Sequence, residues 1–478
     1  MTRFLLSFFM SFALFSVCGQ EQLGVRLDNY SGIQSTFLNP THSANLPLKW
    51  NLNLAGASAF LDNTYLFLKK TNMLHLLANT DNVKIITEFK GTPPPSDVIV
   101  LDFFDNYKKA FSDVELKING PAFAFHKGQH SGGIFYNMRF QVETPRIPSQ
   151  FNYYKFENYD YRQKVTFERT EARAMLWDEF GANYAYNWET NVGRAQIGLN
   201  LKYLRGFEGG YAGSWSPLVF ARYPRDSAFL GIPDVSFGLT TGNLDNIKNG
   251  KYELMQQGKG VGFDLGFAWL ISDDETSYKW RLSAALLDIG KIKFSPLAER
   301  HYINKTSKTN FFTKYDFDDI KTPIGLIRKV STLTLGDSMK SLRERAMIIS
   351  TPMAICLMAD YQFYPNTFAS FILQQRILQQ DAPLHRGNLL AASIRYEHRW
   401  FSATLPISLY NYKHLRAGFA ARLGYLTIGS ENIGSWVRRK TFTGTDVYIG
   451  LAFNPFKINL PGLHIQAREK RDIRCYKF

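Results

Sequence analysis

Apolar side chains alternate with small or polar ones in many parts of this chain, most regularly in residues 259–271. One set of alternate positions holds Val261, Phe263, Leu265, Phe267 and Trp269, and the other holds Gly260, Gly262, Asp264, Gly266 and Ala268. Successive side chains of a β-strand point to opposite faces. An apolar face backed by glycines and an acid suits a strand with lipid on one side and an enclosed, wetter interior on the other. The segment therefore predicts a strand of a membrane barrel.

The same alternation recurs along the chain. It is found in residues 132–142, 180–188, 197–203, 390–400, 415–425 and 447–453, with further candidates near Trp50, Phe123, Phe237, Leu282, Ile355, Phe371 and Leu405. Aromatic residues gather near the ends of these segments, as in the interfacial girdles of membrane proteins. We therefore expect an all-β fold, a transmembrane antiparallel β-barrel of about 14 strands.

The connections between these segments differ in length. Short links such as 189–194 and 397–402 alternate with the long segments 61–113, 143–171, 206–234 and 297–345. This is the pattern of periplasmic turns and long extracellular loops. A helix is expected at residues 73–78 of the first long segment, and no wall strand is expected in the fourth.

The N-terminus has the pattern of a secretory signal peptide. Arg3 precedes an apolar run from Phe4 to Val17 that is too short to span a bilayer, and small and polar residues follow it. Cleavage is expected after Gly19. An alternative is lipidation of Cys18, although bulky Val17 fits that signal poorly. The signal peptide predicts export, and the strand pattern predicts the outer membrane of a Gram-negative cell.

Two regions of the mature chain do not fit the wall pattern. Residues 20–47 are irregular and rich in Asn, Ser, Thr and Gly, which predicts a hatch or plug in the barrel mouth. Residues 457–478 carry charges on both faces, so lipid would not accept them as a strand. We expect a signal peptide at 1–19, a hatch at 20–47, a barrel at 48–456 and a polar tail at 457–478.

Composition agrees with a membrane barrel and narrows the choice of partners. Aromatic residues make up 15% of the chain, and no apolar stretch after Val17 reaches the roughly 20 residues of a spanning helix. The formal charge of +15 does not indicate nucleic acid in an exported protein. It suits solvated loops, anionic lipopolysaccharide or an acidic protein partner. Two alternatives remain for Cys356 and Cys475: a disulfide formed in an oxidising compartment, or two free thiols.

The sequence offers little for catalysis. Gly258-Lys259-Gly260 lacks the rest of a phosphate-binding loop and starts a strand, so it indicates a turn. No Gly-x-Ser-x-Gly motif is present, none of the histidines stands in a catalytic motif, and no metal-ligand spacing occurs. We expect no enzyme, no cofactor and no metal.

Charged residues at inward positions form the main candidate site. They are Arg139, Lys202, Asp264, Asp360, Arg376, Arg395, Glu397 and Arg399. Enclosed charges must pair or stay hydrated. One interpretation is a structural network that fixes the hatch. The other is a gated pathway in which the hatch around Asn39 and Pro40 moves to admit a ligand.

Three stretches resemble the FadL/PorV-like outer-membrane barrels of Bacteroidota. They are Phe37-Leu38-Asn39-Pro40, residues 258–266 and residues 282–290. Thr41 stands where the family usually has alanine. The resemblance implies a 14-stranded barrel with an N-terminal hatch, but it transfers no substrate.

Two functions remain open from the sequence. The first is a channel that passes hydrophobic small molecules across the outer membrane. The second is a barrel that transports nothing and acts as a partner or scaffold in surface protein export, as in type IX secretion, with a secretion-system or surface protein bound to its long loops. A wall opening and an apolar tunnel behind Asn39 would favour the channel. A lumen filled by the hatch and by charge pairs would favour the scaffold.

Overall fold

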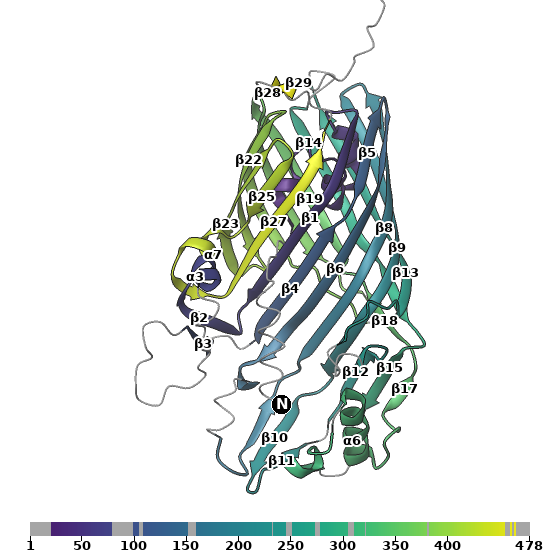
Figure 1. Ribbon diagram of the computed structural model, residues 1–478, viewed down its shortest axis with the longest axis vertical. Helices are drawn as coiled ribbons and strands as arrows, with labels where there is room; N and C mark the ends of the chain where they lie inside the picture. The colour runs from purple at the N-terminus through teal and green to yellow at the C-terminus, as the bar shows by residue number, and fades with distance from the viewer. Residues whose placement is uncertain are drawn as a thin grey trace, which may run out of the picture.

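The computed structural model describes residues 21–78, 99–104, 109–151, 159–231, 233–244, 251–272, 278–304, 310–320, 322–379, 382–454, 459–460 and 463–464 (Figure 1). The predicted signal peptide and its cleavage site, Cys475 and nearly all of the predicted tail lie outside these residues, so those expectations remain predictions. In the tail region only the short strands β28 (Asn459–Leu460) and β29 (Leu463–His464) are described.

A single antiparallel wall closes on itself. Its first strand, β1 (Trp50–Asn63), pairs on one side with β4 and β5 and on the other with the last wall strand, β27, where Gly56 lies opposite Gly450. Some wall strands are interrupted and consist of two or three consecutive segments. When each interrupted strand is counted once, the wall is a closed 14-strand barrel. The elements of the wall are β1, β4 (Lys109–Asn119) with β5 (Ala122–Lys127), β6 (His130–Pro148), β8 (Glu171–Thr190), β9 (Gly193–Ser214), β13 (Gly258–Ile271) with β12 (Val235–Thr240), β14 (Trp280–Phe294) with β15 (Ala298–Ile303), β19 (Ala354–Tyr364) with β17 (Leu342–Glu344) and β18 (Met347–Ser350), β20 (Thr367–Arg376), β21 (Leu389–Glu397), β22 (Phe401–Tyr410), β23 (His414–Ala417) with β24 (Phe419–Leu423), β25 (Leu426–Ser430) and β27 (Gly444–Phe453).

The expected number of strands is confirmed, but two assignments behind it are wrong. The strand near Phe237 is β12, which continues the wall position of β13 beside β9 instead of adding a position. The strand expected at residues 415–425 ends at Leu423, because the chain reverses at Gly424 (φ +60°) and returns as β25, a strand not expected from the sequence. Glycine accepts this left-handed conformation without steric cost. The two errors cancel in the count.

Short turns and long connections lie at opposite ends of the barrel (Figure 1). At the long end β6 and β9 continue to Pro148 and Ser214, well into segments expected to be loops. The fourth long segment does contain wall elements, β15 and β17, contrary to expectation. Beyond the alternating apolar region these elements carry polar residues, so the lipid-facing pattern does not mark them.

Smaller elements decorate the long end. A 4-stranded sheet is formed by β7 (Lys164–Phe167), β10 (Leu218–Tyr223), β11 (Ser227–Leu230) and β16 (Asn310–Thr313), and a 3-stranded sheet by β2 (Leu66–Thr71), β3 (Val100–Phe103) and β26 (Lys440–Phe442). The helices are α3 (Met73–Ala78), as expected, α6 (Pro323–Leu335) and α7 (Ile433–Val437), with the 3-10 turns η4 (Ser149–Phe151) and η5 (Lys314–Asp316). None of the helices among the described residues has the length and apolarity to cross a membrane.

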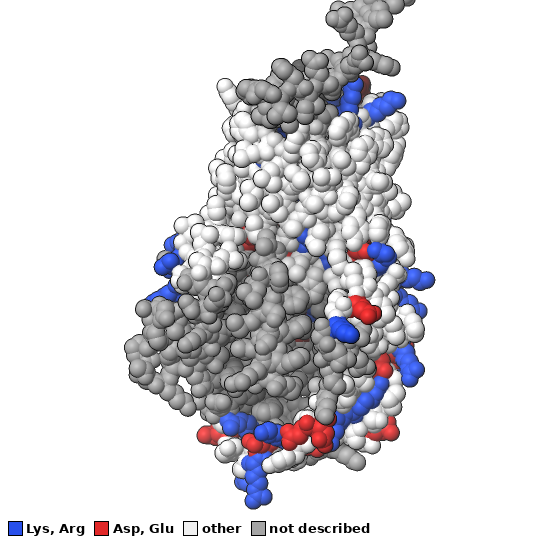
Figure 2. All heavy atoms as spheres, in the orientation of Figure 1, with Lys and Arg blue, Asp and Glu red and all other residues white. Residues whose placement is uncertain are grey.

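The outside of the barrel carries a broad apolar band. Ile134, Leu201, Val261, Ile394 and Leu405 are each more than half exposed on it. Figure 2 shows this band almost free of charge in the upper half of the barrel, whereas charged side chains gather around the lower end. The alternate positions of the same strands are buried and face the interior, as period-two geometry requires.

Residues 21–46, called the inner segment from here on, lie inside the barrel. They form α2 (Leu23–Arg26), η1 (Gly32–Phe37) and η2 (Pro40–Asn45), and nearly all of their side chains are buried. Leu23, Leu27 and Leu38 pack against an apolar patch of the inner wall that includes Leu287 and Ile372. The inner segment then leads directly into β1 at the short-turn end (Figure 1).

Candidate functional site

Asn39 and Pro40 fasten the inner segment to three wall strands. The Asn39 amide Nδ2 donates to the carbonyl oxygens of Phe267 (3.3 Å) on β13 and Ala284 (3.1 Å) on β14. The Pro40 carbonyl accepts a hydrogen bond of 3.0 Å from Asn183 on β8. Asn39 also caps η2 by accepting from the Thr41 backbone N–H at 3.0 Å. This residue thus holds both the local turn and its position against the wall.

The wall provides room for this contact by means of glycines. An ideal Cβ on Gly266 would lie 2.2 Å from Asn39 Oδ1, and one on Gly198 would lie 2.5 Å from the Pro40 carbonyl carbon. Real Cβ atoms do not approach other atoms so closely, so larger residues at these positions would displace η2. The glycine-rich inner face noted in the sequence is therefore a seat for the inner segment.

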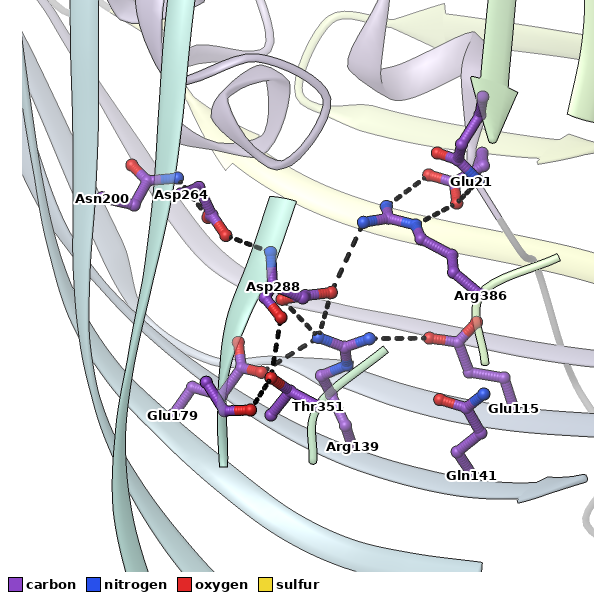
Figure 3. A network of polar contacts seen from close by, with 12 residues as sticks. Glu21, Glu115, Arg139, Gln141, Glu179, Asn200, Asp264, Asp288, Thr351 and Arg386 are labelled. Carbon is purple, nitrogen blue, oxygen red and sulfur yellow. Dashed lines mark hydrogen bonds and ion pairs between the residues drawn. The ribbon is translucent and has the colours of Figure 1, made fainter. Parts of the chain in front are cut away.

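A network of ion pairs crosses the lumen around Asp288 (Figure 3). Asp288 accepts from Arg139 at 3.0 Å and from Lys202 at 2.7 Å, and Arg386 Nη1 lies 3.4 Å away. Lys202 also pairs with Asp264 at 2.8 Å, and Arg139 pairs with Glu179 at 3.0 Å. The structure therefore brings the sequence candidates Arg139, Lys202 and Asp264 together. All three are buried, and their ion pairs compensate for the water that these charges have lost.

A β-bulge creates this arrangement. Asp288 has φ +54°, and the register between β13 and β14 shifts between Phe263 and Leu265, opposite Asp288. Strict alternation would place Asp288 on the outer face with Leu286, but the bulge turns it inward, where its backbone N–H donates to Asp264 at 2.6 Å. Bulges re-aim side chains in this way.

A second cluster holds the other sequence candidates. Arg395 donates to Asp360 at 2.6 Å and also pairs with Glu397, and Arg281 lies 3.0 Å from the same aspartate. Glu397 accepts from the Asn29 amide of the inner segment at 2.9 Å. Asp360, Arg395 and Glu397 are thus neighbours, but they belong to a cluster separate from that of Asp288.

The expectation that Arg399 points into the lumen is wrong. Strand β21 ends at Glu397, and Arg399 is exposed in the turn that leads to β22. Its backbone carbonyl accepts from Arg422 at 3.2 Å. Period-two counting does not extend through a turn, so the alternation assigned this residue to the wrong environment.

The spaces left inside this part of the barrel are small. Around Asp288 and Arg26 a cavity of about 10 Å³ remains, and one of about 20 Å³ lies beside Arg139 and Tyr410. Each holds no more than roughly one water molecule. The inner segment and the ion pairs therefore leave little space around Asp288, and a cavity of about 120 Å³ lies beyond them beside Arg386 and Arg376.

A larger cavity opens at the long-loop end. Its volume is about 620 Å³, and we call it the vestibule. Its lining combines apolar and charged side chains, among them Tyr211, Trp215, Met347, Leu378, Arg173 and Arg376. Arg173 is held at 2.6 Å by Glu171, another lining residue. The vestibule therefore offers a partly apolar surface with cationic groups at its edge.

Two consecutive residues link the vestibule to the inner segment. His385 lines the vestibule, and its backbone N–H donates to Glu143 at 2.8 Å. Arg386 points the other way and donates from Nε and Nη2 to the two oxygens of Glu21, both at 2.7 Å. Burial and the nearby charges of Arg173 and Arg376 lower the pKa of His385 to about 3, so its ring is neutral at neutral pH.

Several residues of the site were missed from the sequence. Glu179 stands in phase with inward Asn183, so alternation could have found it. Asp288 stands out of phase, and Glu21 and Arg386 lie in irregular segments, so no periodic signal marks them. Among the described residues, no cluster of His, Cys, Asp and Glu is arranged to hold a metal ion. Cys356 is buried on the inner face of β19.

The sequence matches one known protein family. The sequence matches the model of DUF5723, a family of unknown function, over residues 40–431. The chain belongs to DUF5723. No curated protein sequence matches this DUF5723 chain.

Several solved structures are similar to this chain over most of its length, with low sequence identity. The CymD monoaromatic hydrocarbon channel is 9% identical, with a TM-score of 0.34 over 92% of this chain and 98% of that one. The toluene transporter TbuX of Ralstonia pickettii is 8% identical, with a TM-score of 0.30 over 88% and 92%. A FadL homologue of Pseudomonas aeruginosa is 8% identical, with a TM-score of 0.23 over 91% and 97%.

Proposed function

We propose that this DUF5723 protein is a barrel of the bacterial outer membrane. The closed ring leaves no free strand edge, which a spanning sheet in lipid requires. The uncharged apolar band on the outside and the ion-paired interior support the same placement, as does the predicted signal peptide. The test is fractionation of cells together with heat-modifiable migration of the purified chain. Recovery in the soluble periplasmic fraction without detergent would contradict the placement.

We infer further that the barrel is a gated channel for hydrophobic small molecules, with the inner segment as its hatch. The observation that carries this proposal is the adjacency of His385 and Arg386. One lines the vestibule and the other holds Glu21 of the inner segment. A ligand that displaces this loop would weaken the hold on Glu21. A molecule arriving from outside would thereby loosen the hatch that blocks it.

The vestibule suggests which molecules to try first. Tyr211, Trp215, Met347 and Leu378 offer apolar contact, and Arg376 lies beside them. A molecule with an apolar body would bury that body here, and an anionic end would meet a cation. Radiolabelled toluene and oleate are therefore suitable probes, since one is neutral and the other carries a carboxylate.

A disulfide lock tests the gate directly. Ser43 of η2 and Ser131 of β6 are buried with their Oγ atoms 3.2 Å apart, close enough for a double cysteine variant to bridge. In a chain with Cys356 and Cys475 replaced by alanine, oxidised S43C/S131C should abolish uptake of the probe by cells, and reduction should restore it. S43C alone is the control. Uptake that is unchanged by the closed bridge would contradict a moving hatch.

The scaffold function keeps one specific observation in its favour. Little space remains in the lumen around Asp288, where two cavities measure about 10 and 20 Å³. A barrel that serves protein export has no need of a pathway there, and its long-loop end, with α6 and the 4-stranded sheet, would be the contact surface. Failure of both probes to enter, combined with a stoichiometric protein partner in detergent extracts, would favour this function over the channel.

A further inference from the structure

Basic side chains stand face to face on the outside of three adjacent strands. Lys259 of β13 lies directly opposite Arg205 of β9 on one side and Lys293 of β14 on the other. Lys291 is two residues along from Lys293 on the same face. The three lysines are exposed. Like charges in directly opposed positions destabilise a sheet. An anion bound between these side chains would offset their repulsion.

The described acids beside this cluster, Asp178 and Glu208, already have partners. Asp178 is fully buried beneath Arg205 and forms an ion pair with it, while Tyr136 donates to the same carboxylate at 3.2 Å. Glu208 accepts from Asn243 at 2.6 Å and from Gln257 at 3.0 Å. Among the described residues, no carboxylate forms an ion pair with Lys259 or Lys293. The cluster therefore presents net positive charge outward.

An apolar groove adjoins the cluster on the side of the uncharged band. It measures about 770 Å³ and is lined on the outer face by Ile134, Phe180, Leu201, Tyr203, Val261 and Phe263. Ala182 faces outward in the groove, and its small side chain leaves the wall hollow there. Val261 and Phe263 follow Lys259 on the same face of β13, at intervals of about 7 Å.

We propose that this face binds one anionic lipid of the outer leaflet, with its phosphate on the lysine cluster and its acyl chains in the groove. The inference rests on the membrane placement proposed above, but not on the channel. A lipid fits this face because the cations adjoin the apolar groove, with Lys259 two residues from Val261 on the outer face of β13. Basic groups at a membrane surface attract anionic headgroups in this way.

The test measures binding of diphosphorylated lipid A to the purified full chain in neutral detergent by native mass spectrometry. The variant K259Q/K291Q/K293Q should bind on the order of a hundredfold more weakly, because three lysine charges that attract phosphate are lost. The matched control K251Q/K314Q/K340Q removes the same charge from exposed lysines elsewhere and should bind as the parent does. Ala182→Trp fills the groove and should also weaken binding.

Two further arms identify the bound chemistry. Inorganic phosphate at equal concentration should not displace the lipid, and lipid A without phosphates should bind more weakly. Equal binding by the two triple variants, or by lipid with and without phosphate, would overturn the proposal. So would a cross-linked dimer that seats a second copy in the groove. Heat-modifiable migration checks the barrel itself, so loss of the membrane placement is distinguishable from loss of this site.

Discussion

Arg386 and Glu21 join a long-end loop to the start of the inner segment through a two-point ion pair, with both N···O distances at 2.7 Å. Arg26 reaches the same carboxylate at 2.6 Å, and Gln374 donates to it at 2.9 Å. Because Arg386 also approaches Asp288, the loop, the inner segment and the wall meet at one side chain. This relationship is the basis of the first prediction.

Arg386→Gln should destabilise the folded barrel by about 3 kcal/mol, because a buried carboxylate and Asp288 each lose a charged partner. We expect thermal unfolding in detergent to shift to lower temperature and a cysteine at position 43 to react faster with maleimide. Arg300→Gln is the control, since its pair with Glu344 is about half exposed and worth no more than about 1 kcal/mol. Equal shifts for the two variants would show that Arg386 does not hold the inner segment.

Substitutions of Asp288 should separate its charge from its backbone conformation. Asp288→Asn keeps a residue that tolerates φ +54° and removes the charge, whereas Asp288→Ala loses both. We expect stability to fall in the order parent, Asn, Ala, with a total loss of several kcal/mol in urea titrations. Asn366→Ala is the control for the backbone alone, because Asn366 has φ +60° in an exposed turn. A loss at Asp288 no larger than at Asn366 would contradict the network.

Gly266→Ala and Gly198→Ala should each lift η2 from the wall, because the added methyl group would overlap Asn39 or Pro40. Overpacking of this kind costs about 1–3 kcal/mol. Gly450→Ala is the matched control, since a Cβ there meets no atom within 4 Å. Thermal unfolding and maleimide labelling of a cysteine at position 43 provide the measurements. If all three variants match the parent, the glycine seat is unimportant.

Leu201→Arg should destabilise the barrel and Leu254→Arg should not, although the two leucines are similarly exposed, at 57% and 54%. Leu201 lies in the apolar band, where an arginine facing lipid costs about 2–4 kcal/mol. Leu254 lies in a connection at the long-loop end, where an arginine meets water. Urea unfolding in liposomes measures the difference. Equal stability of the two variants would place the band in water and remove the membrane assignment.

Much of the fold was accessible from the sequence because lipid on one side and an enclosed interior on the other impose a local, repeating pattern. Val261, Phe263 and Leu265 are exposed and Asp264 is buried, as alternation predicted. The helix at Met73–Ala78 and the entry into β1 at Trp50 also agree. The pattern failed where a turn interrupts it, as at Gly424, and where strands leave the apolar band, as in β15.

The sequence by itself determined much of the wall: which side chains of the regular strands face outward, roughly how many strands close the ring and several of the charges that enter the lumen. Only the tertiary structure decided which of those charges meet. Asp288 faces inward because of a bulge that alternation cannot register, and its partners Arg139, Lys202 and Arg386 come from three other parts of the chain. Side-chain direction along a strand is a local property, whereas the pairing of buried charges depends on distant segments brought together when the barrel closes around the inner segment.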